Sequence, residues 1–376
     1  MSRSPLLQLA DLGQSVWFDN ISRDLLRSGG LEQLRQRGIR GVTSNPTIFQ
    51  KAIAETSHYD SAIREMGTAV DVKAVYEKLA IDDIRAACDV LKPTYTETRG
   101  LDGYVSLEVS PELAFDTKGT LEDAKRLATA VARPNLMVKI PGTREGVPAI
   151  REAIAAGLNI NVTLLFSVEA HDAVLDAYMS GLEQRVREGK PVDGIASVAS
   201  FFVSRVDTSI DKTLEEKAAK AAPAEAQALR DLMGKAAIAN ARLAYKLFLD
   251  RTASTRWAAL KAKGARVQRP LWASTSTKNP KYRDVIYCEE LIGPDTVNTM
   301  PPATVEAFDD HGKAARTLTD DVSGAQRALA QLESKGISMK AVCEKLVDEG
   351  VKSFAKSFAD LMTGIEQKRA QLAGSR

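Results

Sequence analysis

The sequence predicts an α/β fold, a single (β/α)8 TIM barrel of parallel strands. Three observations predict it: apolar runs of strand length recur along the chain, segments with amphipathic-helix spacing separate them, and eight such units are present. Strand–helix alternation produces parallel strands joined by right-handed crossovers, and eight units can close a barrel. A doubly wound open sheet is the alternative, but its usual dinucleotide fingerprint, G-x-G-x-x-G, does not occur.

The expected strands are short apolar runs that end at polar residues, glycine or proline. In chain order they cover residues 16–20, 41–45, 104–108, 136–139, 160–166, 195–202, 271–274 and 296–300. The clearest apolar spacing of the amphipathic-helix type covers residues 70–91, 120–131, 168–188 and 229–249.

Two segments exceed a minimal barrel. Residues 211–230 are rich in Ala, Glu and Lys around Pro223, and we expect a helical excursion after strand six. Residues 303–376 form a polar, helical C-terminal extension with apolar stripes at 314–332 and 339–361. We expect this extension to pack on the outside of the barrel, or one of its helices to form a subunit interface. No Pro-, Gly- or Ser-rich linker divides residues 1–376, so we expect one domain.

Composition excludes several classes of function. A net charge of +2 argues against a nucleic-acid surface, and no apolar stretch has the length of a membrane span. The polar N-terminus does not resemble a signal peptide, and three scattered cysteines indicate a reducing compartment, so the cytoplasm is expected. The three histidines show no metal-ligand spacing and no P-loop occurs, so neither a metal nor a nucleotide site is expected.

Lys139 is the most informative single residue. It interrupts the apolar run Leu136–Ile140, which Pro141 and Gly142 end. A buried ammonium is costly, and burial favours the neutral amine, which is a nucleophile for a carbonyl and forms a Schiff base. On this segment alone, a lysine that pairs with a carboxylate or reaches solvent at a strand edge is the favoured interpretation.

Polar residues at the ends of the other expected strands favour the catalytic interpretation, because barrels of this type build their sites there. Asp19 and Glu108 can transfer protons. Arg205, Ser274 and Lys278 follow strands six and seven, where barrels commonly bind phosphate. The simpler alternative for Arg205 is an ion pair with Asp207 or another acid. Amides and hydroxyls that can hold a polyhydroxylated substrate come from Asn45, Asn161, Thr163 and Ser200.

Six motifs taken together resemble the transaldolase family, in particular its longer bacterial branch. They run in order from about residue 16 to about residue 301, and no single one would be specific alone. They are GVTSNP at 41–46, VKIPG at 138–142, INVTLLFS at 160–167, SFFVSR at 200–205, WASTSTK at 272–278 and GPDTVNTMP at 293–301.

The resemblance implies a class I aldolase barrel with the Schiff-base lysine on strand four, here Lys139. It implies Asp19 as the base for the substrate hydroxyl, and Glu108 with Thr163 and a water as the proton shuttle. Asn45, Asn161 and Ser200 would hold the dihydroxyacetone unit, with Thr43 and Phe202 beside them, while Arg205 and Ser274 would bind phosphate. The shorter branch continues after this serine with an aromatic residue and an arginine; here Lys278 is the expected substitute.

The implied reaction transfers dihydroxyacetone from sedoheptulose 7-phosphate to glyceraldehyde 3-phosphate, giving erythrose 4-phosphate and fructose 6-phosphate. It needs no metal or organic cofactor, and the expected partners are sugar phosphates, with the chain a monomer or homodimer. One alternative is a fructose-6-phosphate aldolase, whose branch usually carries Gln and Tyr where this chain has Glu108 and Phe202. Another is a non-catalytic sugar-phosphate-binding barrel with an unreactive, protonated Lys139.

Overall fold

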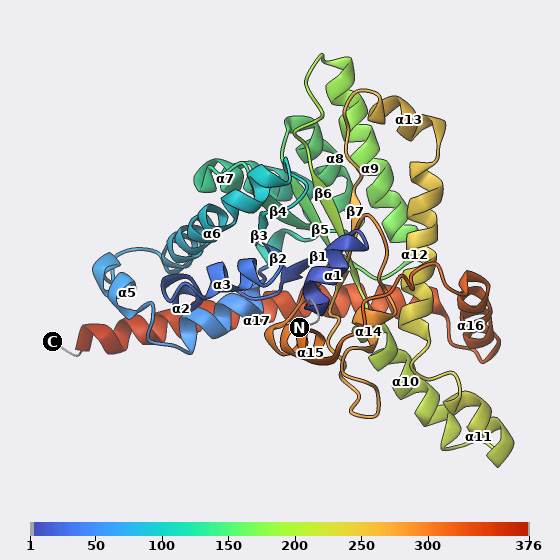
Figure 1. Ribbon diagram of the computed structural model, residues 1–376. Coiled ribbons are helices and arrows are strands. Elements are labelled where there is room, and N and C mark those ends of the chain that lie inside the picture. The colour runs from blue at the N-terminus through green and yellow to red at the C-terminus, as the bar shows by residue number, and fades with distance from the viewer. Residues whose placement is uncertain (1–3, 375–376) are drawn as a thin grey trace.

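The computed structural model describes residues 4–374 and confirms the barrel (Figure 1). Eight parallel strands close in chain order, and β8 pairs with β1. The expected strand positions are confirmed, with bounds that shift by a few residues. The strands are β1 (Gln14–Phe18), β2 (Ile39–Val42), β3 (Tyr104–Glu108), β4 (Leu136–Pro141), β5 (Ile160–Leu165), β6 (Ser197–Phe202), β7 (Arg269–Ala273) and β8 (Thr296–Met300).

The strands are apolar because the barrel interior covers one face and the helices cover the other. Every residue of β3, β4, β5 and β6 is buried. The register places Glu108 of β3 opposite Lys139 of β4, and Lys139 opposite Asn161 of β5. Three polar side chains from the sequence prediction therefore lie level with one another.

Helices surround the barrel and connect successive strands. Those before β4 are α1 (Pro5–Asp11), α2 (Arg23–Arg27), α3 (Gly30–Gln36), α4 (Pro46–Phe49), the π-helix η1 (Gln50–Ala54), α5 (Asp60–Met66), α6 (Val72–Glu97), the 3-10 helix η2 (Pro111–Leu113) and α7 (Thr117–Val131). Those after it are α8 (Gly146–Ala156), α9 (Val168–Arg187), α10 (Ser204–Ala218), α11 (Pro223–Arg230), α12 (Ala236–Thr252), α13 (Thr255–Lys261), α14 (Ile286–Glu289), α15 (Pro302–His311), α16 (Val322–Ser334) and α17 (Met339–Gly374).

Side-chain caps explain where the main crossover helices begin. Asp71, Asp116 and Ser167 accept hydrogen bonds from backbone N–H groups in the first turns of α6, α7 and α9. These helices confirm the expectations for 70–91, 120–131 and 168–188. The expectation for 229–249 is wrong at its start. The chain turns after α11 through Gly234, whose positive φ of 71° suits glycine, and α12 begins at Ala236.

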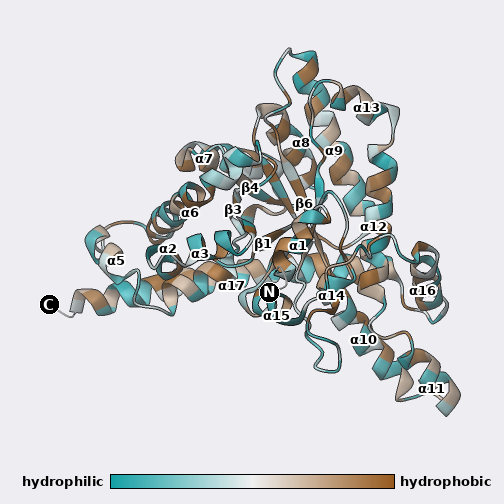
Figure 2. Cartoon of the chain, viewed as in Figure 1, coloured by the Kyte–Doolittle hydropathy of each residue, from teal (hydrophilic) through white to brown (hydrophobic). Residues whose placement is uncertain are grey.

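The C-terminal helix α17 crosses the end of the barrel where the strands finish. It packs against α4 and η1, which follow β2, against η2, which follows β3, and against α10, which follows β6. Figure 1 shows it as a long helix that extends from near α16 to the C-terminus along this end, and Figure 2 shows hydrophilic and hydrophobic residues alternating along it. The extension therefore reaches the strand ends and does not only cover the outer helices. Among residues 4–374, no helix combines the length and apolarity needed to cross a membrane.

Candidate active site

A cavity of about 580 Å³ opens at the carboxyl ends of the strands. All but two of the predicted site residues line it, and the exceptions, Glu108 and Asn161, lie level with Lys139 on the neighbouring strands. The barrel thus brings together side chains that are far apart in the sequence. The predicted residues that line the cavity are Asp19, Thr43, Asn45, Lys139, Thr163, Ser200, Phe202, Arg205, Ser274 and Lys278.

Lys139 is buried at the inner end of this cavity. Its Nζ donates a hydrogen bond to the Ser44 carbonyl oxygen at 3.1 Å and lies 3.4 Å from Oε2 of Glu108. Burial raises the pKa of the Glu108 carboxyl, and the Lys139 ammonium acts in the opposite direction. The amine therefore sits beside a carboxyl group that can gain or lose a proton.

Three buried oxygens around Lys139 have no hydrogen-bond partner among the described residues. They are Oε1 and Oε2 of Glu108 and Oγ1 of Thr163. Leaving a buried polar atom unpaired costs about 1–3 kcal/mol, so such atoms in a native protein indicate a bound water or a reacting group. Neighbouring strands β3 and β5 supply these oxygens on either side of the lysine.

Asp19 lies just beyond β1, and a hydroxyl network holds it. Thr43 Oγ1 donates to Asp19 Oδ1 at 2.6 Å and lies 2.6 Å from Oγ1 of Thr299. Burial raises the pKa of Asp19, while the Thr43 hydrogen bond and the nearby cations Lys139, Arg205 and Lys278 lower it. These opposing effects suit a carboxyl group that transfers a proton.

Asn161 and Ser200 form a chain of hydrogen bonds inside the barrel. Ser200 Oγ donates to Asn161 Oδ1 at 2.7 Å, and Asn161 Nδ2 donates to Ser106 Oγ at 2.9 Å. Asn161 thus orients Ser200, which lines the cavity. Asn45 has its Oδ1 engaged as the N-cap of α4, where it accepts from Ile48 N at 3.0 Å.

Arg205, in the first turn of α10, lies in the part of the cavity where phosphate binding is predicted. The alternative ion pair with Asp207 does not form, because Asp207 accepts from Ala237 N at 2.7 Å and from the Tyr287 hydroxyl at 2.8 Å. Instead, the guanidinium carbon lies 5.1 Å from the centre of the Phe202 ring. Burial lowers the pKa of Arg205, which reflects the cost of an unpaired buried cation.

Two further predicted residues complete this region. Ser274 has a positive φ of 55°, which is uncommon for a residue other than glycine, and its Oγ lies 3.0 Å from Oγ of Ser204. Lys278 lines the same cavity, and its Nζ donates to Ser276 Oγ at 2.7 Å. Burial, followed by the Arg205 charge, lowers the pKa of Lys278. Arg205 and Lys278 therefore form a cationic region suited to an anion.

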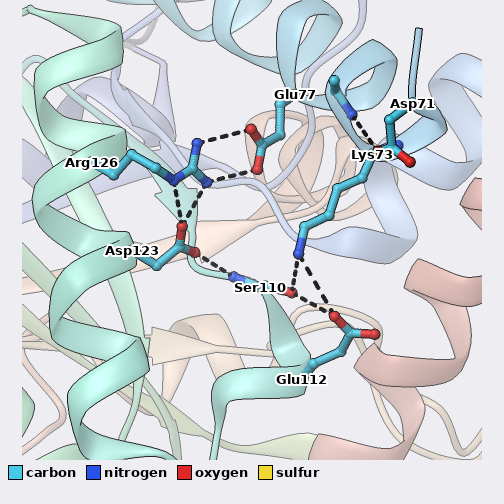
Figure 3. A network of polar contacts seen from close by, with 8 residues as sticks. Asp71, Lys73, Glu77, Ser110, Glu112, Asp123 and Arg126 are labelled. Carbon is cyan, nitrogen blue, oxygen red and sulfur yellow. Dashed lines mark hydrogen bonds and ion pairs between the residues drawn. The ribbon is translucent and has the colours of Figure 1, made fainter. Parts of the chain in front are cut away.

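The segment that follows Glu108 is anchored from outside the barrel (Figure 3). Asp123 accepts a hydrogen bond from Ser110 N at 3.0 Å and pairs with Arg126, which also pairs with Glu77 at 2.7 Å. Lys73 Nζ lies 3.4 Å from Ser110 Oγ. These contacts tie α6 and α7 to the end of β3 and so hold Glu108 in position.

The sequence prediction omitted several residues that line the cavity, among them Lys51, Ser276, Thr299 and Phe354. Ser276 and Thr299 belong to motifs that were already recognised and could have been included. Phe354 has no local signal, because only the crossing of α17 over the barrel end places it there.

Comparisons with known proteins agree with this geometry. The model of the Transaldolase/Fructose-6-phosphate aldolase family matches residues 16–365. A protein of Thermobifida fusca named Transaldolase is 51% identical over 370 residues, which cover 98% of this chain and 99% of that protein. The Transaldolase of Trichodesmium erythraeum is 47% identical over 377 residues, which cover 99% of each chain. By its strand-end lysine, its barrel and these matches, the chain belongs to the transaldolase family.

Proposed function

We propose that the protein is a transaldolase that moves a dihydroxyacetone unit between sugar phosphates through a Schiff base on Lys139. The observation that carries the proposal is the buried Lys139 amine, which lies 3.4 Å from Oε2 of Glu108 in a cavity that also holds Asp19 and Arg205. Apart from this ion pair, the Glu108 carboxyl oxygens have no hydrogen-bond partner within residues 4–374. The named relatives support transfer, and the aldolase and non-catalytic alternatives are not favoured.

The reaction begins when neutral Nζ of Lys139 attacks the C2 carbonyl of a ketose phosphate. Glu108 transfers protons through a water held with Thr163, so that the carbinolamine loses water and the imine forms. Asp19 takes the proton of the C4 hydroxyl, the C3–C4 bond breaks and its electrons move into the imine, which leaves a three-carbon enamine. The aldose phosphate departs, an acceptor aldose phosphate adds at the same carbon, and the steps reverse.

The remaining residues hold the substrates. Asn45, Asn161, Ser200 and Thr43 bind or orient the hydroxyl groups of the three-carbon unit, and Phe202 forms an apolar wall beside it. Arg205, Ser274 and Lys278 bind the phosphate. The imine is the electron sink, so the mechanism uses no metal or organic cofactor. A cytoplasmic location, a monomeric or homodimeric state and the absence of a nucleic-acid partner stay predictions from the sequence.

The test is borohydride reduction in the presence of fructose 6-phosphate, followed by peptide mass spectrometry. We expect a reduced dihydroxyacetone adduct on Lys139, whereas an adduct on another lysine, or none, would contradict the assignment. Without an acceptor, fructose 6-phosphate should release about one equivalent of glyceraldehyde 3-phosphate per site. Erythrose 4-phosphate should then start steady turnover. Equal steady rates with and without an acceptor would identify an aldolase.

A further inference from the structure

Phe354 brings the C-terminal helix into the candidate active site. Its ring centre lies 5.7 Å from Nζ of Lys139 and 6.0 Å from the guanidinium carbon of Arg205. The side chain also lines the substrate cavity, although its residue is only 4% exposed. The ring belongs to the hydrophobic core of the molecule, and in addition it faces two cations.

Arg205 lies within reach of two rings, Phe202 at 5.1 Å and Phe354 at 6.0 Å. Aromatic faces attract a guanidinium at these distances and do not occupy its N–H groups. No carboxylate in the described part of the chain forms an ion pair with Arg205. The Asp19 and Glu349 charges act on this side chain without forming an ion pair with it, and two phenylalanines contact it directly. Its five donors therefore stay available for an oxyanion.

Specific contacts of α17 with neighbouring elements fix the position of Phe354 at the strand ends. Ser357 Oγ lies 2.8 Å from Oγ1 of Thr47 in α4. Gly350 lies so close to β5 that an added Cβ would be 2.8 Å from a methyl carbon of Leu164. Lys368 pairs with Asp60 of α5 at 3.1 Å. Contacts on both sides of Phe354 along α17 thus hold its ring at the strand ends.

We propose that Phe354 is a positioning residue that holds Arg205 with its donors free for the substrate phosphate. The C-terminal helix thereby contributes to the preference of the site for phosphorylated sugars. The inference rests on the proposed function, because it assumes that Arg205 binds the phosphate. It extends that function by assigning a role to α17, which lies outside the six sequence motifs.

The test compares fructose 6-phosphate with unphosphorylated fructose as donors in Phe354→Leu, which keeps an apolar side chain of similar size but removes the ring. We expect KM for fructose 6-phosphate to rise by about three- to tenfold, with kcat and the kinetics of fructose nearly unchanged. Phe354→Tyr retains the ring and should keep the parent ratio of kcat/KM for fructose 6-phosphate to kcat/KM for fructose. Should Phe354→Leu not fold, Phe354→Met offers the same comparison.

Phe358→Leu is the matched control. Phe358 lies one turn further along α17, is similarly buried and faces Lys73 at 5.8 Å, outside the substrate cavity. We expect this variant to lose some thermal stability. Its ratio of kcat/KM for fructose 6-phosphate to kcat/KM for fructose should stay that of the parent protein. An equal loss for both donors in Phe354→Leu, an unchanged ratio, or the same change in Phe358→Leu would overturn the inference.

Arg205→Ala separates failure of the inference from failure of the proposed function. If Arg205→Ala weakens fructose 6-phosphate selectively and Phe354→Leu does not, the inference is wrong and the phosphate role of Arg205 stands. If Arg205→Ala affects both donors equally, the phosphate role of Arg205 is wrong, and the inference fails with it. Borohydride labelling of Lys139 reports on the Schiff base in every variant, independently of phosphate binding.

Discussion

Two buried cation–carboxylate pairs lie at opposite ends of the barrel. Arg269 and Asp102 pair at 2.9 Å near the amino ends of the strands, with side chains that are 6% and 3% exposed. Lys139 and Glu108 pair at 3.4 Å near the carboxyl ends, with side chains that are 6% and 4% exposed. The two pairs have the same charges and almost the same burial, and they differ in the number of hydrogen bonds around them.

The pair at the amino ends is saturated with hydrogen bonds. Asp102 accepts from Arg269, from Ser15 Oγ at 2.7 Å and from Trp17 Nε1 at 3.2 Å. Arg269 also donates to Ser15 Oγ at 2.8 Å and to the Leu101 carbonyl oxygen at 2.7 Å. Good geometry and additional hydrogen bonds are what offset the desolvation of a buried pair. Both Asp102 carboxylate oxygens therefore accept hydrogen bonds from protein groups.

The pair at the carboxyl ends can form further hydrogen bonds. Both Glu108 oxygens lack a hydrogen-bond partner within residues 4–374, and Lys139 donates to a single backbone carbonyl, Ser44. Its members can also exchange a proton, since a lysine can become neutral and an arginine cannot. Burial and charge alone therefore do not distinguish a structural pair from a reactive one. The two kinds of pair are distinguished by the hydrogen bonds around them and by the identity of the cation.

The largest expected effect follows Lys139→Met, which should remove turnover completely because the nucleophile and electron sink are lost. The free energy of unfolding should change little, since Glu108, whose pKa burial already raises, can take up a proton and become neutral. Coupled assay of glyceraldehyde 3-phosphate release and urea unfolding measure the two effects. A well-folded variant with residual turnover would contradict the assignment of Lys139.

Glu108→Gln keeps the shape of the side chain and removes proton transfer at the same pair. Imine formation should slow by about 10²–10⁴-fold, the usual contribution of a general acid–base group. The rate of borohydride-trapped adduct on Lys139, measured in single-turnover experiments, follows this step directly. If trapping stays as fast as in the parent protein, another group carries the proton and Glu108 serves only to pair with Lys139.

Asp102→Asn tests the saturated pair. Arg269 would stay charged and buried without its carboxylate, and breaking such a pair costs about 3–5 kcal/mol of folding free energy. The folded fraction should keep its turnover per site, because the change lies at the opposite end of the barrel. Urea unfolding and active-site titration measure both quantities. Replacing both residues with apolar ones, Asp102→Leu with Arg269→Met, should recover much of the stability, and no recovery would contradict this account.

The sequence predicted the barrel well because its signals are local. Strands buried on both faces appear as continuous apolar runs, as in residues 160–166, and polar residues at their ends identify the candidate site. The prediction for residues 229–249 missed the turn at Gly234, because the apolar spacing continues through it. Local periodicity cannot detect a change of direction that tertiary packing imposes.

Parts of the candidate site depend on distances between segments far apart in the sequence. From the sequence, an ion pair of Arg205 with Asp207, two residues away, is only the alternative to phosphate binding. In the structure Asp207 accepts hydrogen bonds from Ala237 and Tyr287 instead. Phe354 enters the cavity through a helix whose apolar stripe indicates burial and not the surface it covers. Such contacts follow from the path of α17 over the barrel end and leave no motif in the sequence.

Asp207 is another buried carboxylate and extends the comparison, because it accepts hydrogen bonds but pairs with no cation among residues 4–374. Burial raises its pKa to about 6, and the hydrogen bonds from Ala237 and Tyr287 only partly oppose this shift. The folded protein therefore holds this proton between about pH 4 and pH 6, where the unfolded chain releases it. The stabilising contribution of Asp207 is present below about pH 4 and is lost as the pH rises through about 6.

Asp207→Asn should remove this pH dependence, which is the smallest of the expected effects. The free energy of unfolding of the variant, relative to that of the parent protein, should rise by about 2–3 kcal/mol between pH 4 and pH 7. Urea unfolding at several pH values measures the difference. Asp231→Asn, a change at an exposed aspartate, serves as the control. Plotted against pH, its free energy of unfolding should run parallel to that of the parent protein. Parallel curves for Asp207→Asn as well would mean that its two hydrogen bonds compensate for its burial without a paired cation.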